Sequence, residues 1–149
     1  MPKRSHPFHS IHTHEMVRVA ATTPRATVGD PAANADAAID LVKKAAANAV
    51  DLIVFPELSL SSYAIDDLHM QAAQHGATEA AIARLASATA KLRTVMLVGA
   101  AIPRNGRLYN CAVAIARGRI LGVVPKTFLP NYREFYEKRW FASGAGLTG

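Results

Sequence analysis

The sequence predicts an α/β fold in which helices pack on a β-sheet. Two patterns support this prediction: short apolar runs alternate with Ala-rich helical segments in the first two thirds of the chain, and three strand-like runs then follow one another. Helical crossovers join parallel strands, whereas strands separated by short turns pair antiparallel. The chain has 149 residues, of which 50% are hydrophobic, so it is long enough for one globular domain.

The first predicted elements are a strand, a helix and a second strand. Residues 17–21 form a short β-branched run. Asp30 and Pro31 are typical of a helix start, with a side-chain acceptor at the N-cap and proline at the first helical position, and the helix is expected to continue to Asn48. Residues 52–55 are continuously apolar, which predicts a central strand that is covered on both faces.

The next predicted elements are a helix and three strands. A polar loop or short helix is expected at residues 59–68, and an amphipathic run predicts a second helix at residues 78–92. Two turn signals, Asn-Gly and Arg-Gly, then separate three strands, at residues 95–102, 108–116 and 120–124. The predicted order is therefore β-α-β-α-β-β-β.

Residues 1–15 differ in composition from the rest of the chain. They include Lys3, Arg4 and four histidines but no apolar core of the kind that a signal peptide requires. We expect a flexible, basic, His-rich tail there and one domain at residues 16–149. No apolar run approaches the roughly 20 residues of a membrane helix, and the single cysteine excludes a disulfide framework, so a cytoplasmic protein without a membrane partner is expected.

The net charge of +6 makes nucleic acid a partner to consider. The basic residues are concentrated in the second half, where Glu134 and Glu137 are the only acids between Arg84 and Arg139. No DNA- or RNA-reading motif accompanies them, and the aromatic residues cluster near the end of the chain. We therefore expect no nucleic-acid partner, and interpret the charge as a solvated face or as a field that attracts an anionic partner or domain.

Two charged residues follow apolar runs at positions suited to catalysis. Glu57 comes after the strand at 52–55 and Pro56, and Lys126 follows the strand at 120–124. Open α/β sheets bind ligands at the carboxyl ends of their strands, where a carboxylate can act as a base and an ammonium as an electrostatic stabiliser. From position alone, a solvated carboxylate and a surface lysine remain the alternative.

Three segments resemble the nitrilase, or carbon-nitrogen hydrolase, superfamily. They are FPELSLSSYAIDDL at 55–68, LYNCAVAI at 108–115 and VVPKTFLPNYREFYEKRWF at 123–141. The third segment is the most specific, because its K-x-x-L-P-x-Y-x-x-F-x-E-x-R pattern is similar to the glutaminase domain at the amino terminus of glutamine-dependent NAD synthetases. The resemblance runs from Val17 to Phe141.

This resemblance implies a nitrilase-like four-layer α-β-β-α sandwich, of which the chain supplies roughly the first half. It also implies a catalytic triad of Glu, Lys and Cys, in which Glu57 is the general base that takes the thiol proton and Lys126 stabilises the oxyanion. Glu137 corresponds to a second glutamate that supports Lys126 and the substrate. Tyr63 and Tyr132 correspond to residues that shape the glutamine pocket, with ordinary aromatic packing as the alternative.

The nucleophile is the main departure from the family pattern. The family cysteine lies a few dozen residues beyond the lysine, so we expect it beyond Gly149, and we expect this chain to be inactive alone. Cys111 occupies an ordinary strand position and is interpreted as a small buried hydrophobe. Ser62 stands where the family has a glycine, which constrains the turn before Tyr63.

The resemblance implies no cofactor or metal in this chain, and places ATP and Mg²⁺ in a missing synthetase domain that amidates deamido-NAD with ammonia from glutamine. The expected partners are glutamine or another small amide, that synthetase domain, and further copies in a homo-oligomer. Two alternatives remain: a fragment of another nitrilase-family amidase or carbamoylase acting on small linear amides, and a non-catalytic remnant or interaction module. An independent module would unfold cooperatively as a monomer, whereas a half-sandwich exposes a large apolar face.

Overall fold

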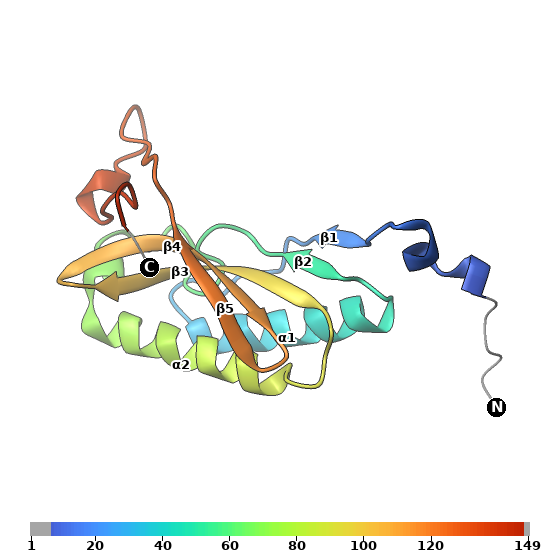
Figure 1. The fold of residues 1–149 in the computed structure, drawn as a ribbon. Coiled ribbons are helices and arrows are strands. Elements are labelled where there is room, and N and C mark those ends of the chain that lie inside the picture. The colour runs from blue at the N-terminus through green and yellow to red at the C-terminus, as the bar shows by residue number, and fades with distance from the viewer. Residues whose placement is uncertain (1–6, 148–149) are drawn as a thin grey trace.

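The computed structural model describes residues 7–147, which form a five-stranded sheet with two helices (Figure 1). The strands are β1 (Val19–Ala21), β2 (Leu52–Val54), β3 (Val95–Arg104), β4 (Arg107–Ala116) and β5 (Arg119–Pro125). The helices are α1 (Pro31–Ala47) and α2 (Ala72–Ala88), and short 3-10 helices lie at η1 (Pro7–His9), η2 (Ile11–His14), η3 (Asp66–Met70) and η4 (Glu137–Arg139).

The order and direction of the strands follow from their connections. β1, β2 and β3 are parallel and are joined through α1 and α2, whereas β3, β4 and β5 form an antiparallel meander. The order of the strands in the sheet is the same as their order in the chain. The predicted sequence of strands and helices is therefore confirmed, and with it the α/β class.

Helix α2 differs from its prediction at both ends. It spans Ala72–Ala88, whereas the sequence pattern predicted residues 78–92. Its N-cap residue, Gln71, makes no side-chain capping bond, so the sequence contains no start signal at that point. At the other end the Thr89 hydroxyl donates to the Leu85 carbonyl at 2.7 Å, which closes the last turn earlier than the apolar periodicity suggests.

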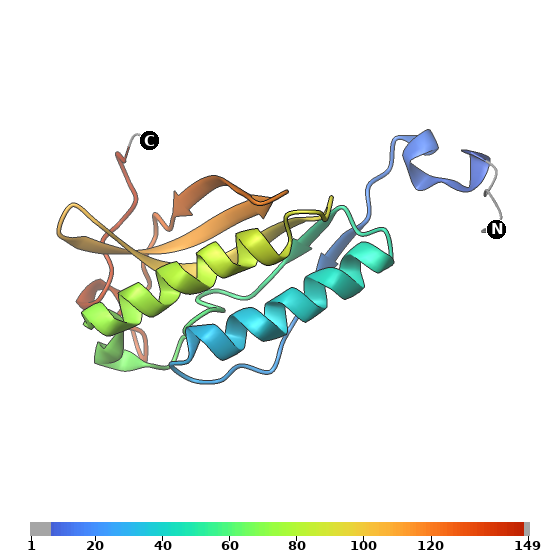
Figure 2. The same cartoon turned by 90° about the horizontal axis from the view of Figure 1, so that it is seen from below.

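The two faces of the sheet differ in what covers them. Both helices pack on one face, the helix-covered face (Figure 2), where Leu85 and Met96 are fully buried. On the opposite face, Val54 is 38% exposed and Val124 is 66% exposed. The predicted cover on both faces of the strand at 52–55 is therefore wrong for the described residues, because the helices form a single layer on one side.

The uncovered face is called the open face below. Side chains alternate between the two faces along each strand, so the strand registers define its members. They include seven apolar residues that are each at least partly exposed: Val19, Leu52, Val54, Leu97, Ala112, Ala114 and Val124.

The start of α1 is tied to the turn that follows β2. As predicted, Asp30 caps the helix, and its carboxylate accepts a backbone N–H at 3.0 Å. Asn34 is 6% exposed and donates through Nδ2 to the carbonyls of Thr27 and Leu60, at 2.8 and 2.9 Å. This buried amide therefore links the loop before α1 to the turn after β2.

The predicted tail is only partly within the described residues. Its residues 7–14 contain the short helices η1 and η2, whereas residues 1–6, including Lys3 and Arg4, lie outside. Among the residues that the structure describes, no helix combines the length and the apolar character that crossing a membrane would require.

Candidate active site

Glu57 lies in a tight turn at the carboxyl end of β2. The chain passes through Pro56 and Glu57 to Leu58, which has a φ of +49°. This turn lies directly on Gly99 of β3: a Cβ added to Gly99 would meet the Pro56 carbonyl oxygen at 2.6 Å and the backbone nitrogen of Leu58 still more closely. Because only glycine permits this approach of two backbones, Gly99 sets the position of Glu57.

Lys126 directly follows β5, as predicted. Its backbone amide donates to the Asn110 carbonyl at 2.7 Å, and its carbonyl accepts from the Gly144 amide at 2.9 Å. β5 is antiparallel to β4, and β4 is antiparallel to β3, so the carboxyl ends of β2, β3 and β5 lie at one edge of the sheet. This topology is why Glu57 and Lys126 meet although 69 positions separate them.

Glu137 reaches the same edge from η4, and its side chain is 1% exposed. Its amide donates to the Pro130 carbonyl at 3.1 Å, and its carbonyl accepts from the Phe141 amide at 2.8 Å. The Phe141 ring is 4% exposed and packs with Leu58 and Leu108. Burial of this ring therefore holds η4 against the turn that carries Glu57.

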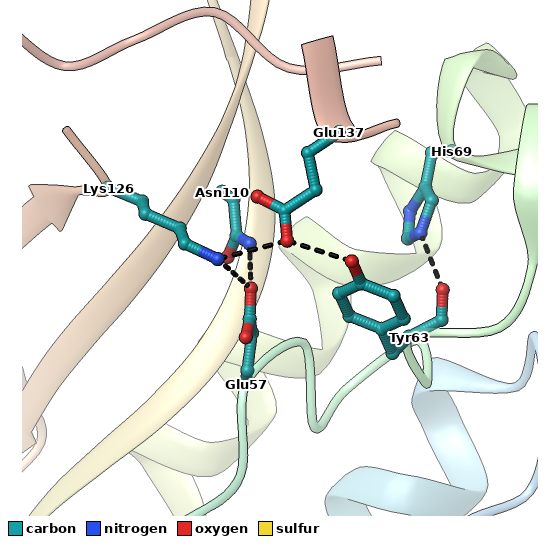
Figure 3. A network of polar contacts seen from close by, with 6 residues as sticks. All are labelled: Glu57, Tyr63, His69, Asn110, Lys126 and Glu137. Carbon is teal, nitrogen blue, oxygen red and sulfur yellow. Dashed lines mark hydrogen bonds and ion pairs between the residues drawn. The ribbon is translucent and has the colours of Figure 1, made fainter. Parts of the chain in front are cut away.

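Five polar side chains form one network at this edge (Figure 3). Lys126 Nζ lies 2.7 Å from Glu57 Oε1 and 2.9 Å from Glu137 Oε1, so one ammonium joins both carboxylates. Tyr63 donates its hydroxyl to the same Glu137 oxygen at 2.8 Å, and Asn110 donates through Nδ2 to Glu57 Oε1. The other oxygen of Glu137, Oε2, is buried and has no partner among the described residues.

The electrostatics of the network keep two donors protonated. Burial opposes the charge of Lys126, but its hydrogen bonds to Glu57 and Glu137 and the charges of these carboxylates together raise its pKa. Burial, followed by the hydrogen bond to Glu137 and the charge of that group, raises the pKa of Tyr63 far above its usual value. The site therefore contains a fixed positive charge between two carboxyl groups and a permanent O–H donor.

A cavity of about 370 Å³ opens beside this network on the open face of the sheet. Glu57, Asn110 and Lys126 contribute its polar groups. Its apolar wall includes Val54, Leu97, Ala112 and Val124. An apolar space of this size with a few convergent polar groups is typical of a small-molecule site. The arrangement offers an exposed carboxylate for proton transfer and an ammonium for a developing negative charge.

The structure brings together four of the five side chains that the sequence analysis selected. Tyr132 is the exception: it is 63% exposed, and its ring packs edge-on against Phe135 with centroids 6.0 Å apart. It makes no contact with the network among the interactions of the described residues. The catalytic and substrate-binding roles of all five remain predictions at this point.

Three further residues at or near the site were not predicted from the sequence: Asn110, Asp67 and His69. Asn110 is 4% exposed in an otherwise apolar strand, and a buried amide in such a run indicates a polar partner, so this signal was present. Asp67 and His69 belong to η3, whose polar contacts leave no periodic pattern in the sequence. Their importance becomes visible only in the folded chain.

Cys111 is buried, as predicted, with 4% of its surface exposed. Burial raises the pKa of its thiol to about 11, so the thiol is protonated at neutral pH and is a poor nucleophile. Within residues 7–147, no group of three or more His, Cys, Asp or Glu side chains is arranged so that it could hold a metal ion.

Residues 18–148 match the carbon-nitrogen hydrolase family, and the chain belongs to that family. Its fold is similar to that of a glutamine-dependent NAD(+) synthetase from Cytophaga hutchinsonii, with a TM-score of 0.79 and 24% identity over 85% of this chain and 22% of that protein. An amidase from Nesterenkonia sp. aligns with a TM-score of 0.73 and 23% identity over 86% of this chain and 48% of the amidase. The chain thus corresponds to about half of a nitrilase fold, as predicted.

Sequence similarity specifies the branch of the family. The chain is 47% identical over 142 residues to the glutamine-dependent NAD(+) synthetase of Mycobacterium tuberculosis and 34% identical over 131 residues to that of Thermotoga maritima. These alignments cover 95% and 88% of this chain but only 21% and 23% of the two relatives. The chain is therefore part of a carbon-nitrogen hydrolase domain. It is similar to part of these synthetases and spans about a fifth of their length.

Proposed function

We propose that this chain contributes the glutamate and lysine residues of a glutamine-hydrolysing site, whose ammonia serves the ATP-dependent amidation of deamido-NAD to NAD. The observation that carries the proposal is the Lys126 ammonium between two carboxyl groups, 2.7 Å from Glu57 and 2.9 Å from Glu137. The choice of glutamine as substrate is supported by the identity of 47% to a glutamine-dependent synthetase.

In the proposed reaction, a cysteine thiol from outside these 149 residues attacks the side-chain amide carbon of glutamine. Glu57, which lines the cavity and is 42% exposed, takes the thiol proton and then delivers it to the leaving nitrogen, so that ammonia departs. Lys126 stabilises the negative oxygen of the tetrahedral intermediate. Water then attacks the thioester, which releases glutamate and restores the thiol.

In this proposal Glu137 and Tyr63 hold Lys126 in its working position. A buried carboxylate is costly unless it is paired, and Glu137 obtains its partners from the Lys126 ammonium and the Tyr63 hydroxyl. The two carboxyl groups therefore act differently: Glu137 fixes the ammonium from the interior, whereas Glu57 lies at the cavity.

The open face supports the proposal that further polypeptide completes the site. Its valines Val54 and Val124 are 38% and 66% exposed, and a second sheet packed on them would bury this apolar surface. We assign the nucleophile to that second sheet, and ATP and Mg²⁺ to a separate synthetase domain. Assembly of the complete protein as a homo-oligomer is part of the same proposal.

A chimera tests this function. The chain replaces its matching 142-residue region in the M. tuberculosis glutamine-dependent NAD(+) synthetase, and NAD formation is measured with glutamine or with ammonium chloride as the nitrogen source. We expect NAD formation with both nitrogen sources. In Glu57→Gln and Lys126→Met, only the glutamine-dependent activity should be lost, and the activity with ammonium should remain. A folded chimera that uses ammonium but not glutamine would overturn the proposal. Hydrolysis of butyramide in preference to glutamine would favour the amidase alternative.

The isolated chain tests the assignment of the nucleophile. We expect no release of ammonia from glutamine, because the thiol of Cys111 is buried and protonated. Release that Glu57→Ala abolishes would place a nucleophile within these 149 residues and contradict the proposed division of the site.

A further inference from the structure

His69 lies next to the backbone of Tyr63, and its side chain is buried, with 1% of the residue exposed. Its Nε2 donates a hydrogen bond to the Tyr63 carbonyl at 3.1 Å (Figure 3). Because a carbonyl oxygen only accepts, this contact requires the proton on Nε2, and a neutral ring then carries none on Nδ1. Nδ1 is buried and has no partner among the described residues. The imidazole is therefore held with one polar contact, which is directed at the backbone of Tyr63.

The same ring packs on the segment that follows Glu137. The centroid of the His69 ring lies 5.7 Å from that of Trp140 and 5.1 Å from that of Phe141. The Phe141 amide in turn donates to the Glu137 carbonyl at 2.8 Å. One side chain thus contacts both the segment that carries Tyr63 and the segment that carries Glu137.

Further hydrogen bonds fix the position of η3, the short helix that contains His69. His75 of α2 donates through Nε2 to the His69 carbonyl at 2.7 Å. Asp67 accepts two hydrogen bonds of 2.7 Å from Arg139 and one of 2.9 Å from Trp140 Nε1. The Asp67–Arg139 pair is exposed and therefore screened by solvent and salt, whereas the His69 side chain is buried. His69 consequently provides the buried part of the contact between η3 and the segment at Arg139 to Phe141.

We propose that His69 is a positioning residue, whose Nε2–H holds the backbone of Tyr63 so that the Tyr63 hydroxyl stays on Glu137. The hydroxyl must reach Glu137 Oε1 at 2.8 Å from a backbone position set by the two hydrogen bonds that the Tyr63 carbonyl accepts, one from His69 and one from the Ile65 amide at 3.0 Å. The Ile65 bond is present in all variants, so the variants test the His69 bond. Packing volume alone would not select that backbone position. The effect on glutamine hydrolysis rests on the proposed function, but the positioning itself does not.

Two variants of the full chain separate the donor from the ring. His69→Gln retains an N–H donor and removes the ring, whereas His69→Phe retains the aromatic contacts with Trp140 and Phe141 and removes the donor. Nitration by tetranitromethane, quantified by peptide mass spectrometry, reports on Tyr63 because the reagent attacks the phenolate. Tyr132, which is 63% exposed, is the reference in each sample. Burial, followed by the contact with Glu137, raises the pKa of Tyr63. Each pKa unit lost when the side chain leaves this position would increase its phenolate about tenfold.

We expect slow nitration of Tyr63 relative to Tyr132 in the unmodified chain and in His69→Gln. In His69→Phe the rate at Tyr63 should increase by about tenfold or more. Equal rates at Tyr63 in the two variants would overturn the proposal, because ring packing or general loosening would then account for the position of Tyr63. Circular dichroism and the emission of Trp140, the single tryptophan, show whether each variant folds.

The unmodified chain provides a test that needs no variant. Long-range proton–nitrogen NMR spectra are expected to show the Nε2–H tautomer of His69 at neutral pH. The Nδ1–H tautomer would overturn the proposal, because Nε2 could not then donate to the Tyr63 carbonyl. Neither measurement depends on glutamine hydrolysis, so a failure of the proposed function would leave both results readable.

Discussion

Both faces of the sheet carry apolar side chains, but they differ in cover. On the helix-covered face, Leu85 and Met96 are fully buried, whereas Val54 and Val124 on the open face are 38% and 66% exposed. The polar network and its cavity lie at the edge of the open face. The difference indicates that one face supplies most of the stability of this chain, whereas the other carries the residues suited to chemistry and has apolar surface left to bury.

Truncation of a core side chain is expected to produce the largest effect. Leu85 is 0% exposed, so Leu85→Ala should lower the free energy of unfolding by about 2–5 kcal/mol, through lost burial and the cavity left behind. Val124→Ala on the open face is the control and should change it by less than about 0.5 kcal/mol. Urea unfolding followed by circular dichroism measures both. Similar losses in the two variants would mean that the open face is covered in solution, and would contradict the difference between the two faces.

The contact between Gly99 and the Glu57 turn should produce the next largest effect. In Gly99→Ala the new methyl group would overlap the backbone of Pro56 and Leu58, so we expect a loss of about 1–3 kcal/mol and a displaced Glu57. The matched control is Gly122→Ala, since a Cβ on Gly122 meets nothing within 4 Å. Unfolding measures stability, and glutamine hydrolysis by the chimera measures the position of Glu57. Full activity in Gly99→Ala would contradict the role of this close approach.

The elements of the fold were predictable where local signals and tertiary structure agree. Asp30 caps α1 as expected, and the Asn105-Gly106 turn between β3 and β4 has positive φ values of 51° and 72°. The start of α2 was not predictable, because Gln71 makes no capping bond. The cover of β2 was also mispredicted: a continuous apolar run indicates that both faces are suited to burial, but not which elements are available to bury them.

The candidate site was predictable to the extent that strand ends determine it. Glu57 and Lys126 follow strands whose carboxyl ends meet, so their proximity follows from topology. Glu137 and Tyr63 could be selected only through the family resemblance, since 74 positions separate the two side chains that hydrogen-bond. His69 carried no signal, because its role depends on aromatic rings that approach it only after folding.

Lowering the pH should reduce the contribution of His69 to the free energy of unfolding. Burial lowers the pKa of His69; its hydrogen bond to the Tyr63 carbonyl and the charge of Asp66 oppose this effect, and His75 adds to it. Since the folded pKa lies below the unfolded value of 6.5, the unfolded chain binds more protons between the two values. The contribution of His69 is therefore complete above about pH 6.5 and decreases as the pH falls through the folded pKa.

Urea unfolding between about pH 8 and pH 5 measures this dependence. The difference in unfolding free energy between the unmodified chain and His69→Gln should decrease as the pH falls, because glutamine does not titrate. A constant difference across that range would show that His69 is not buried as a neutral ring.

Backbone strain next to the site should produce the smallest effect, and here we expect a gain. Leu58, Ser62 and Asp66 all have positive φ, and all three lie between Glu57 and His69. Ser62, at +71°, stands where the family resemblance implies a glycine. A side chain in this region costs about 1–2 kcal/mol, but glycine also increases the entropy of the unfolded chain by about 0.4–1 kcal/mol. Ser62→Gly should therefore raise the free energy of unfolding by less than about 1 kcal/mol.

Ala64→Gly is the control for this gain, because Ala64 lies in the same loop without a positive φ and should lose stability through the entropy term alone. Thermal unfolding of the two variants measures the contrast. Equal losses would mean that no strain is stored at Ser62. A gain in Ser62→Gly alone would locate strain in the loop that leads from Glu57 to Tyr63, next to the groups suited to chemistry.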